Sequence, residues 1–219
     1  MISSPISKLP PTEFLTAGPS TAATLIVLAH GAGAAMDTPF METISNGLAG
    51  AGHRVLRFEF PYMQRRRRTA IKAPPDRPPV LLASWQKALR DARDASPHHQ
   101  QCIIGGKSMG GRIASMLADE VEADGLICLG YPFHPPGKPD RLRVDHLQSL
   151  RCRSLILQGE RDTMGCRDEV AGYRLSAAIK LCWLSDGDHS LKPRRASGHT
   201  EADNLAAAIA AINHFLTTL

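Results

Sequence analysis

Short apolar runs alternate with amphipathic stretches along this chain of 219 residues. Runs rich in Leu, Ile and Val predict strands buried on both faces of a parallel sheet, at residues 24–29, 54–60, 101–104, 125–130, 154–158 and 179–184. Helical spacing of apolar residues, or strong helix formers, predicts helices at residues 40–48, 80–95, 112–118, 167–176 and 201–219. The pattern predicts a single α/β domain, with a mostly parallel sheet covered by helices on both faces.

The domain is expected to span residues 23–219, after an N-terminal arm at residues 1–22 that several prolines interrupt. The arm has no apolar core, so we do not expect it to be a signal peptide. No stretch approaches the roughly 18 apolar residues of a membrane helix, so no membrane span is expected. The five cysteines are scattered without a Cys-x-x-Cys pair, which favours buried, reduced thiols and a cytoplasmic location.

The net charge of +5 is concentrated in one place, because Arg65–Arg68 contributes four adjacent positive charges. Prolines follow this run closely, so we predict an exposed loop over residues 64–79. A contact with an acidic partner or a negatively charged substrate stays open. A nucleic-acid partner is not expected, since the aromatic content is 5% and no nucleic-acid-binding module is recognisable.

The run Gly106-Lys107-Ser108-Met109-Gly110 contains Gly-x-Ser-x-Gly between a predicted strand and a predicted helix. In this context the serine sits on a sharp, strained turn that pushes its hydroxyl out of the sheet. Glycines on either side remove side chains where strand and helix pass closely. Ser108 is therefore the candidate nucleophile, and a glycine-rich turn without chemistry is the alternative.

Candidate partners of Ser108 follow later strands of the predicted sheet. Because parallel strands end at one rim, residues after these strands are expected to meet there. His189 is the candidate base and Asp162 the candidate acid that orients it. His30 and His134 are competing histidines at the same rim. Asp186 and Asp188 lie nearer to His189 in sequence, but both suit a turn around Gly187.

Backbone amides are needed to stabilise the oxyanion that develops during acyl transfer. The amide of Met109 is one candidate, and that of Ala32 or Gly33 is the other. The alternative for this second segment is a plain glycine turn. Four further rim residues are candidates for binding the substrate: Lys107, His30, Tyr131 and His134.

Arg112 falls in the first turn of the helix after the serine, where a cation opposes the helix dipole. We therefore expect a carboxylate partner and name Glu59 for a structural ion pair. Binding of a substrate carboxylate is the alternative.

Several motifs together resemble the α/β-hydrolase superfamily, over most of the chain: His-Gly-Ala-Gly from His30, Gly-Lys-Ser-Met-Gly-Gly-Arg from Gly106, Tyr-Pro-Phe-His-Pro-Pro-Gly-Lys from Tyr131, and Gln-Gly-Glu-Arg-Asp from Gln158. They are most similar to small hydrolases related to dienelactone hydrolases, a group that includes a subunit of an animal histone-acetyltransferase complex. Dienelactone hydrolases use a cysteine nucleophile, so Ser108 departs from them.

The resemblance implies an α/β-hydrolase fold and a serine triad without cofactor or metal. The expected activity is hydrolysis of small carboxylic esters, thioesters or lactones through an acyl-enzyme. A weak or inactive protein-interaction module is one alternative, and a peptidase or acyl transferase is another. Larger members insert a lid where residues 131–150 lie, so only a minimal cap is expected here. The oligomeric state stays open, with a homodimer as one option.

Overall fold

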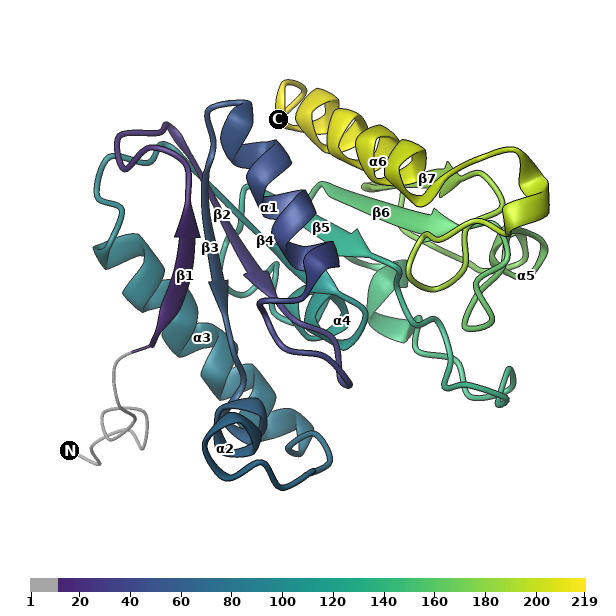
Figure 1. The fold of residues 1–219 in the computed structure, drawn as a ribbon, viewed down its shortest axis with the longest axis horizontal. Helices are drawn as coiled ribbons and strands as arrows, with labels where there is room; N and C mark the ends of the chain where they lie inside the picture. Colours follow the sequence, from purple (N-terminus) through teal and green to yellow (C-terminus); the bar gives the residue numbers. More distant parts are fainter. Residues whose placement is uncertain (1–11) are drawn as a thin grey trace.

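One seven-stranded sheet organises the protein, and its strand order is β1-β3-β2-β4-β5-β6-β7 (Figure 1). The structure, a computed structural model, describes residues 12–219. The strands are β1 (Phe14–Ala17), β2 (Thr24–Ala29), β3 (Arg54–Phe58), β4 (Gln101–Lys107), β5 (Gly125–Leu129), β6 (Ser154–Gly159) and β7 (Ile179–Leu184). The helices are α1 (Pro39–Gly50), α2 (Pro61–Thr69), α3 (Pro78–Asp94), α4 (Met109–Ser115), α5 (Arg167–Ala171) and α6 (Glu201–Leu216).

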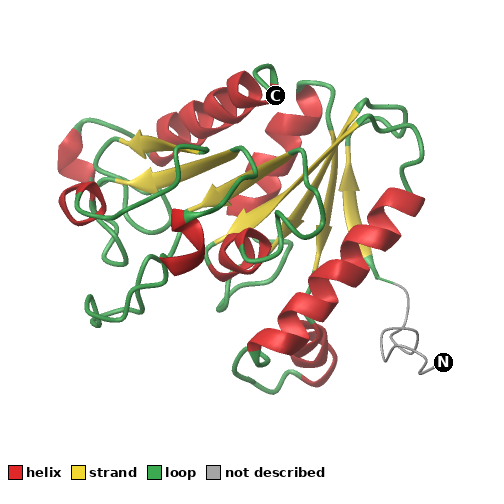
Figure 2. Ribbon diagram, turned by 180° about the vertical axis from the view of Figure 1, so that it is seen from behind, coloured by secondary structure: helices red, strands yellow, loops and turns green. Residues whose placement is uncertain are grey.

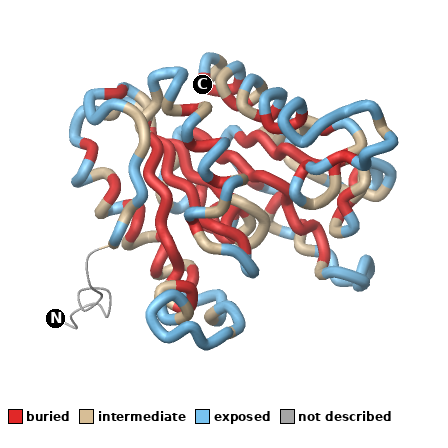
Figure 3. Tube along the Cα trace, viewed as in Figure 1, coloured by how far each residue is buried: buried red, intermediate tan, exposed pale blue. Residues whose placement is uncertain are grey.

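Helices cover both faces of the sheet, as the alternation predicted (Figures 1 and 2). Successive side chains of a strand point to opposite faces, and in β2 both sets are apolar. Leu25 and Val27 pack into the same core as Trp85 of α3 and Ile113 of α4. Ile26 belongs to the second core, which also holds apolar residues of α1 and α6. The continuous burial of the central strands is visible in Figure 3.

The edge strand β1 lies within the segment expected to be an N-terminal arm. Residues Phe14–Ala17 pair antiparallel with β3, whereas the other strand pairs are parallel. This strand is only four residues long and two of them are exposed, so it carries little hydrophobic signal. The described part of the sheet therefore begins before residue 23.

The four consecutive arginines form part of helix α2, so the exposed loop predicted over residues 64–79 is wrong in its first part. Arginine is a good helix former, and Pro61 occupies the first turn where its missing amide hydrogen does no harm. The helix ends at Thr69 and is capped by Ala70, which adopts a left-handed conformation. Only the stretch between α2 and α3 is a loop, and Figure 3 shows how exposed this region is.

The segment after β5 is short, as expected for a minimal cap. Between β5 and β6 the only helical turn in the described structure is a 3-10 turn at Asp145–Gln148. Helix α5 is also shorter than predicted and ends at Ala171 rather than near residue 176. All five cysteines are unpaired, and three of them are buried. None of the described helices has both the length and the apolar character needed to cross a bilayer.

Candidate active site

Ser108 occupies a sharp turn between β4 and α4, with φ of 51° and ψ of −116°. A non-glycine residue rarely adopts a positive φ, and such strain costs roughly 1–3 kcal/mol. The surrounding structure holds the turn, because the Ser108 amide donates to the Leu129 carbonyl and the Arg112 amide donates to the Ser108 carbonyl. The hydroxyl is thus presented at the carboxyl ends of the strands, as the motif predicted.

The two glycines of the motif are required by close backbone contacts. A Cβ atom at Gly106 would lie 2.2 Å from the Ala29 carbonyl oxygen. A Cβ atom at Gly110 would lie 2.4 Å from that same oxygen and 2.6 Å from the His30 carbonyl oxygen. Since backbone atoms cannot move aside easily, both positions exclude a side chain. This confirms the predicted close passage of strand and helix.

Ser108, His189 and Asp162 form one continuous chain of hydrogen-bonded side chains. The distance between Ser108 Oγ and His189 Nε2 is 2.8 Å, and that between His189 Nδ1 and Asp162 Oδ2 is 2.7 Å. These three residues come from the ends of β4, β7 and β6 and are up to 81 residues apart in sequence. The arrangement matches the order that a nucleophile, a base and an orienting acid require.

Asp162 is completely buried and its carboxylate is fully engaged by donors. Oδ2 accepts a hydrogen bond from Gln158 Nε2 at 2.8 Å, and Oδ1 accepts one from the Met164 amide at 2.9 Å. Gln158 is itself anchored, because its Oε1 accepts from the Tyr131 amide at 2.7 Å. These contacts aim the carboxylate at the imidazole and compensate its removal from water.

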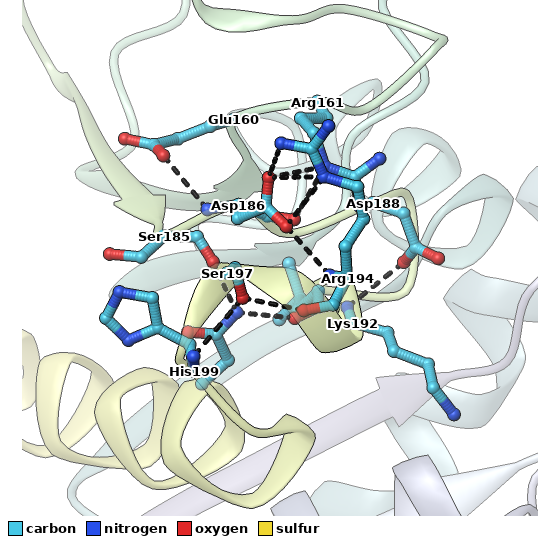
Figure 4. Close-up of polar contacts among 11 residues, drawn as sticks. Glu160, Arg161, Ser185, Asp186, Asp188, Lys192, Arg194, Ser197 and His199 are labelled. Atoms are coloured by element: carbon cyan, nitrogen blue, oxygen red, sulfur yellow. Dashed lines mark hydrogen bonds and ion pairs between the residues drawn. The ribbon is translucent and has the colours of Figure 1, made fainter.

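The loop after β7 that carries His189 is braced by an ionic cluster around Asp186 (Figure 4). Arg194 contacts the Asp186 carboxylate at 2.5 Å and Arg161 contacts it at 2.9 Å. Hydrogen bonding to Arg194 lowers the pKa of Asp186 to about 2. Asp188 accepts hydrogen bonds from the amides of Ser190 and Lys192, which is turn chemistry. Neither aspartate contacts the His189 ring in the described structure, and Asp162 does.

Lys107 points inward beside the histidine rather than out to solvent. Its ammonium group donates to the His189 carbonyl oxygen, and it also lies 5.4 Å from the centre of the Phe40 ring. Burial lowers the pKa of Lys107 to about 8. The contact ties the residue before Ser108 to the backbone of His189.

The loop after β2 brings Ala32 and Gly33 to the wall of the same cavity as Met109. The Tyr62 hydroxyl donates to the Ala32 carbonyl oxygen at 3.0 Å, which holds the carbonyl side of this loop against the protein. Within residues 12–219, the amides of Ala32, Gly33 and Met109 donate no hydrogen bond. They are therefore available to a negatively charged oxygen near Ser108.

Three of the four proposed substrate-binding residues are buried away from the cavity wall. His30 accepts a hydrogen bond from the Phe60 amide through Nε2 at 3.1 Å, and burial lowers its pKa. Tyr131 donates its hydroxyl to the Arg143 carbonyl oxygen at 2.9 Å. The His134 ring lies 3.6 Å from Glu169. Of the four, only Lys107 lines the cavity, and the other three support its walls.

The cavity above Ser108 has a volume of about 610 Å³. Ala32, Met109 and His189 lie on its wall with Ser108, together with apolar side chains such as Leu81 and Ile113. Two arginines, Arg112 and Arg143, also line it. This is room for a small organic molecule next to the serine hydroxyl.

Glu59 is not the partner of Arg112, so the predicted ion pair is wrong. Its buried carboxylate contacts Arg67 of α2 at 2.6 Å, and Arg67 also contacts Asp37 at 2.9 Å. The cause is the unpredicted helix α2, which places Arg67 near the end of β3. Arg112 faces the cavity instead.

Gln158 and Arg143 belong to the site, and sequence reasoning missed both. Gln158 is the one polar residue at the end of an otherwise apolar run, Leu155–Leu157, a signal that could have identified it. Arg143 lies in the loop after β5, five residues beyond the motif that ends at Lys138, so no comparable signal marks it. In residues 12–219 no group of three or more His, Cys, Asp or Glu side chains could hold a metal ion.

Comparison with known proteins identifies the family of this chain and proteins of similar fold. Residues 22–217 match the family model described as an alpha/beta hydrolase domain. An alpha/beta serine hydrolase without a lid from Xanthomonas campestris is 16% identical, with a TM-score of 0.68 over 95% of this chain and 94% of that chain. A dienelactone hydrolase from Anabaena variabilis is 16% identical, with a TM-score of 0.69 over 95% and 98%. An esterase from Pyrococcus furiosus is 13% identical, with a TM-score of 0.68 over 94% and 90%.

Proposed function

We propose that this chain, which belongs to the alpha/beta hydrolase family, is a serine hydrolase that cleaves small carboxylic esters, thioesters or lactones through an acyl-enzyme. The observation that carries the proposal is the hydrogen-bonded chain from Asp162 through His189 to Ser108, with distances of 2.7 and 2.8 Å. A serine alone is a poor nucleophile, and this arrangement supplies the base that it needs.

In the proposed reaction, Ser108 Oγ attacks the carbonyl carbon while His189 Nε2 takes the hydroxyl proton. Asp162 holds the ring with Nδ1 protonated and stabilises the imidazolium that forms. His189 then gives the proton to the leaving alcohol or thiol, and the acyl group stays on Ser108. Water attacks this acyl-enzyme with His189 again as base, which releases the acid and restores the serine.

The oxyanion of each tetrahedral intermediate would be bound by the amide of Met109 and by that of Ala32 or Gly33. Their lack of other partners among the described residues supports this role. Loss of one such donor typically costs about 3–4 kcal/mol of transition-state stabilisation. Lys107 supports the site as a positioning residue, since it binds the His189 backbone.

Small substrates are favoured by the cavity of about 610 Å³ and by the short segment between β5 and β6. The similar fold of an esterase and of a dienelactone hydrolase agrees with an ester or lactone bond as the target.

Replacement of the nucleophile tests the proposal directly. Ser108→Ala should abolish labelling by a fluorophosphonate probe and reduce hydrolysis of 4-nitrophenyl esters by roughly 1000-fold or more. Ser190→Ala is a matched control, because Ser190 lines the same cavity and its hydroxyl forms no hydrogen bond with the His189 ring within residues 12–219. This control should still be labelled.

Equal labelling of wild type and Ser108→Ala would disprove the role of Ser108. A correctly folded wild-type protein without any labelling or ester hydrolysis would instead favour a protein-interaction module.

A further inference from the structure

Two cationic side chains of the cavity lack the partners that arginines normally have. Among residues 12–219, neither Arg112 nor Arg143 forms an ion pair, and buried Arg112 Nε has no hydrogen-bond partner. Both arginines line the cavity that contains Ser108. The undescribed residues 1–11 contain no Asp or Glu that could serve as a partner.

No carboxylate of residues 12–219 forms an ion pair with either arginine, although Asp145 lies near His146 of the same region. Burial, and then the positive charge of Arg112, lower the pKa of both Arg143 and His146. Burial raises the pKa of Tyr131, so its hydroxyl stays neutral. The result is a partly buried cluster of like charges, which is unfavourable in the absence of an anion.

The other charged groups of the cavity are already occupied. Asp76 contacts Arg65 at 2.5 Å and also accepts the Tyr62 amide at 2.9 Å. Lys107 is bound to the His189 carbonyl. In the described part of the chain, Arg112 and Arg143 are therefore the cavity charges without a protein partner.

Arg112 lies close to Ser108 along the backbone of helix α4. Its amide donates to the Ser108 carbonyl at 3.0 Å, so the two residues are four positions apart on one helical turn, a rise of about 6 Å along the axis. Because Arg112 and Ser108 also line the same cavity, an anion held by Arg112 would share that cavity with a carbonyl that Ser108 attacks.

Building on the proposed serine hydrolase activity, we propose that Arg112 and Arg143 bind a free carboxylate of the substrate. The preferred substrates are then esters that carry a second, ionised carboxyl group. The guanidinium group fits this role because its planar fork matches a carboxylate with two parallel hydrogen bonds. A carboxylate would also relieve the repulsion between the two cations.

Matched ester pairs test this specificity. We compare kcat/KM for the 4-nitrophenyl monoester of adipic acid with that for 4-nitrophenyl hexanoate, whose acyl group also has six carbons. A second pair, 4-acetoxybenzoate and 4-acetoxybenzamide, places the carboxylate on the leaving group. At least one pair should favour the carboxylate about tenfold or more, and the preference should fall with added salt. The pair that responds identifies which side of the ester faces the arginines.

Arg112→Gln and Arg143→Gln should each reduce this preference about tenfold. Arg141→Gln is the matched control, because Arg141 is exposed on the same loop as Arg143 and lies outside the cavity. It should retain the wild-type preference. Ester hydrolysis with no preference for either carboxylate, or with a preference that the two cavity variants keep, would overturn the proposal.

A binding measurement separates failure of this inference from failure of the proposed function. Adipate should bind to Ser108→Ala, as followed by isothermal titration, and should bind about tenfold more weakly when Arg143→Gln is added. That result in a protein without esterase activity would retain the carboxylate site and reject the hydrolase. Absence of adipate binding together with absence of a kinetic preference would reject the carboxylate site alone.

Discussion

The arginines of α2 and the arginines of the cavity differ in what balances their charge. In α2, Arg65 contacts Asp76, and Arg67 contacts both Glu59 and Asp37. In the cavity, Arg112 and Arg143 form no ion pair within the described structure. Half of the run that dominates the sequence is thus paired with neighbouring carboxylates. Two arginines far apart in sequence share a cavity in which neither has a carboxylate partner among the described residues.

If the cavity arginines bind a ligand as proposed, local charge density in a sequence is a poor guide to ligand binding. A run of like charges has to be tolerated by the fold, which here gives Arg65 and Arg67 carboxylate partners. A ligand site, in contrast, keeps charge without a protein partner and accepts the repulsion this entails. Three experiments compare the stability contributed by paired arginines, in α2 and around Asp186, with that contributed by the cavity arginines, from the largest expected effect to the smallest.

Arg67→Ala should destabilise the protein by about 2 kcal/mol, because it leaves the buried carboxylate of Glu59 without its ion pair. Urea denaturation at neutral pH measures the change. Arg68→Ala is the matched control, since Arg68 is exposed and forms no ion pair in the described structure, and it should shift stability by less than about 0.5 kcal/mol. Equal effects of the two variants would contradict a structural role for Arg67.

Asp186→Asn should have a smaller effect, and one that depends on pH. Hydrogen bonding to Arg194 lowers the folded-state pKa of Asp186 to about 2, below its unfolded-state value. Its stabilising contribution is therefore fully present above the unfolded-state pKa and is lost as the pH falls through the folded-state pKa.

The urea midpoints of wild type and Asp186→Asn should thus differ at pH 7 and converge towards pH 2. A difference that stays constant over this range would show that the Asp186 ion pairs with Arg161 and Arg194 do not account for it.

Arg112→Gln and Arg143→Gln should have the smallest effect on stability. Each removes one of two neighbouring cations and breaks no ion pair, so the stability should stay within about 0.5 kcal/mol of wild type or rise slightly. Thermal and urea unfolding measure it. A decrease in the free energy of unfolding above about 1 kcal/mol would show that these arginines stabilise the fold as Arg67 does, which would contradict the difference between the two regions.

Much of the fold can be predicted from the sequence, because apolar strand runs and the helical spacing of apolar residues are local patterns. Buried parallel strands require continuous apolar runs, and Thr24–Ala29 and Ser154–Gly159 fulfil this closely. Strand β1 and helix α2 were missed, since one is a short edge strand and the other contains consecutive arginines without an apolar stripe. Strand β1 is held by its pairing with β3, and helix α2 by ion pairs to Asp76 and Glu59. Neither contact can be inferred from the local propensities of the residues.

The candidate triad could be named from sequence because strand ends of a parallel sheet converge at one rim. Its members were identified by their residue types and by the order Ser, Asp, His along the chain. Ser108 was recognised by the glycine-flanked turn in which it lies. The partner of each charged group could not be named in the same way. Glu59 was assigned to Arg112, and the fold places it beside Arg67.

By itself, the sequence determined the α/β alternation, the turn that exposes Ser108 and the rim on which Asp162 and His189 lie. Only the tertiary structure decided which charges neutralise one another and which face the cavity. The reason is physical: strand and turn formation depends on neighbouring residues, whereas charge pairing depends on distances across the fold. From these distances we propose that Arg112 and Arg143, which line the cavity with Ser108, are the cations that bind a substrate.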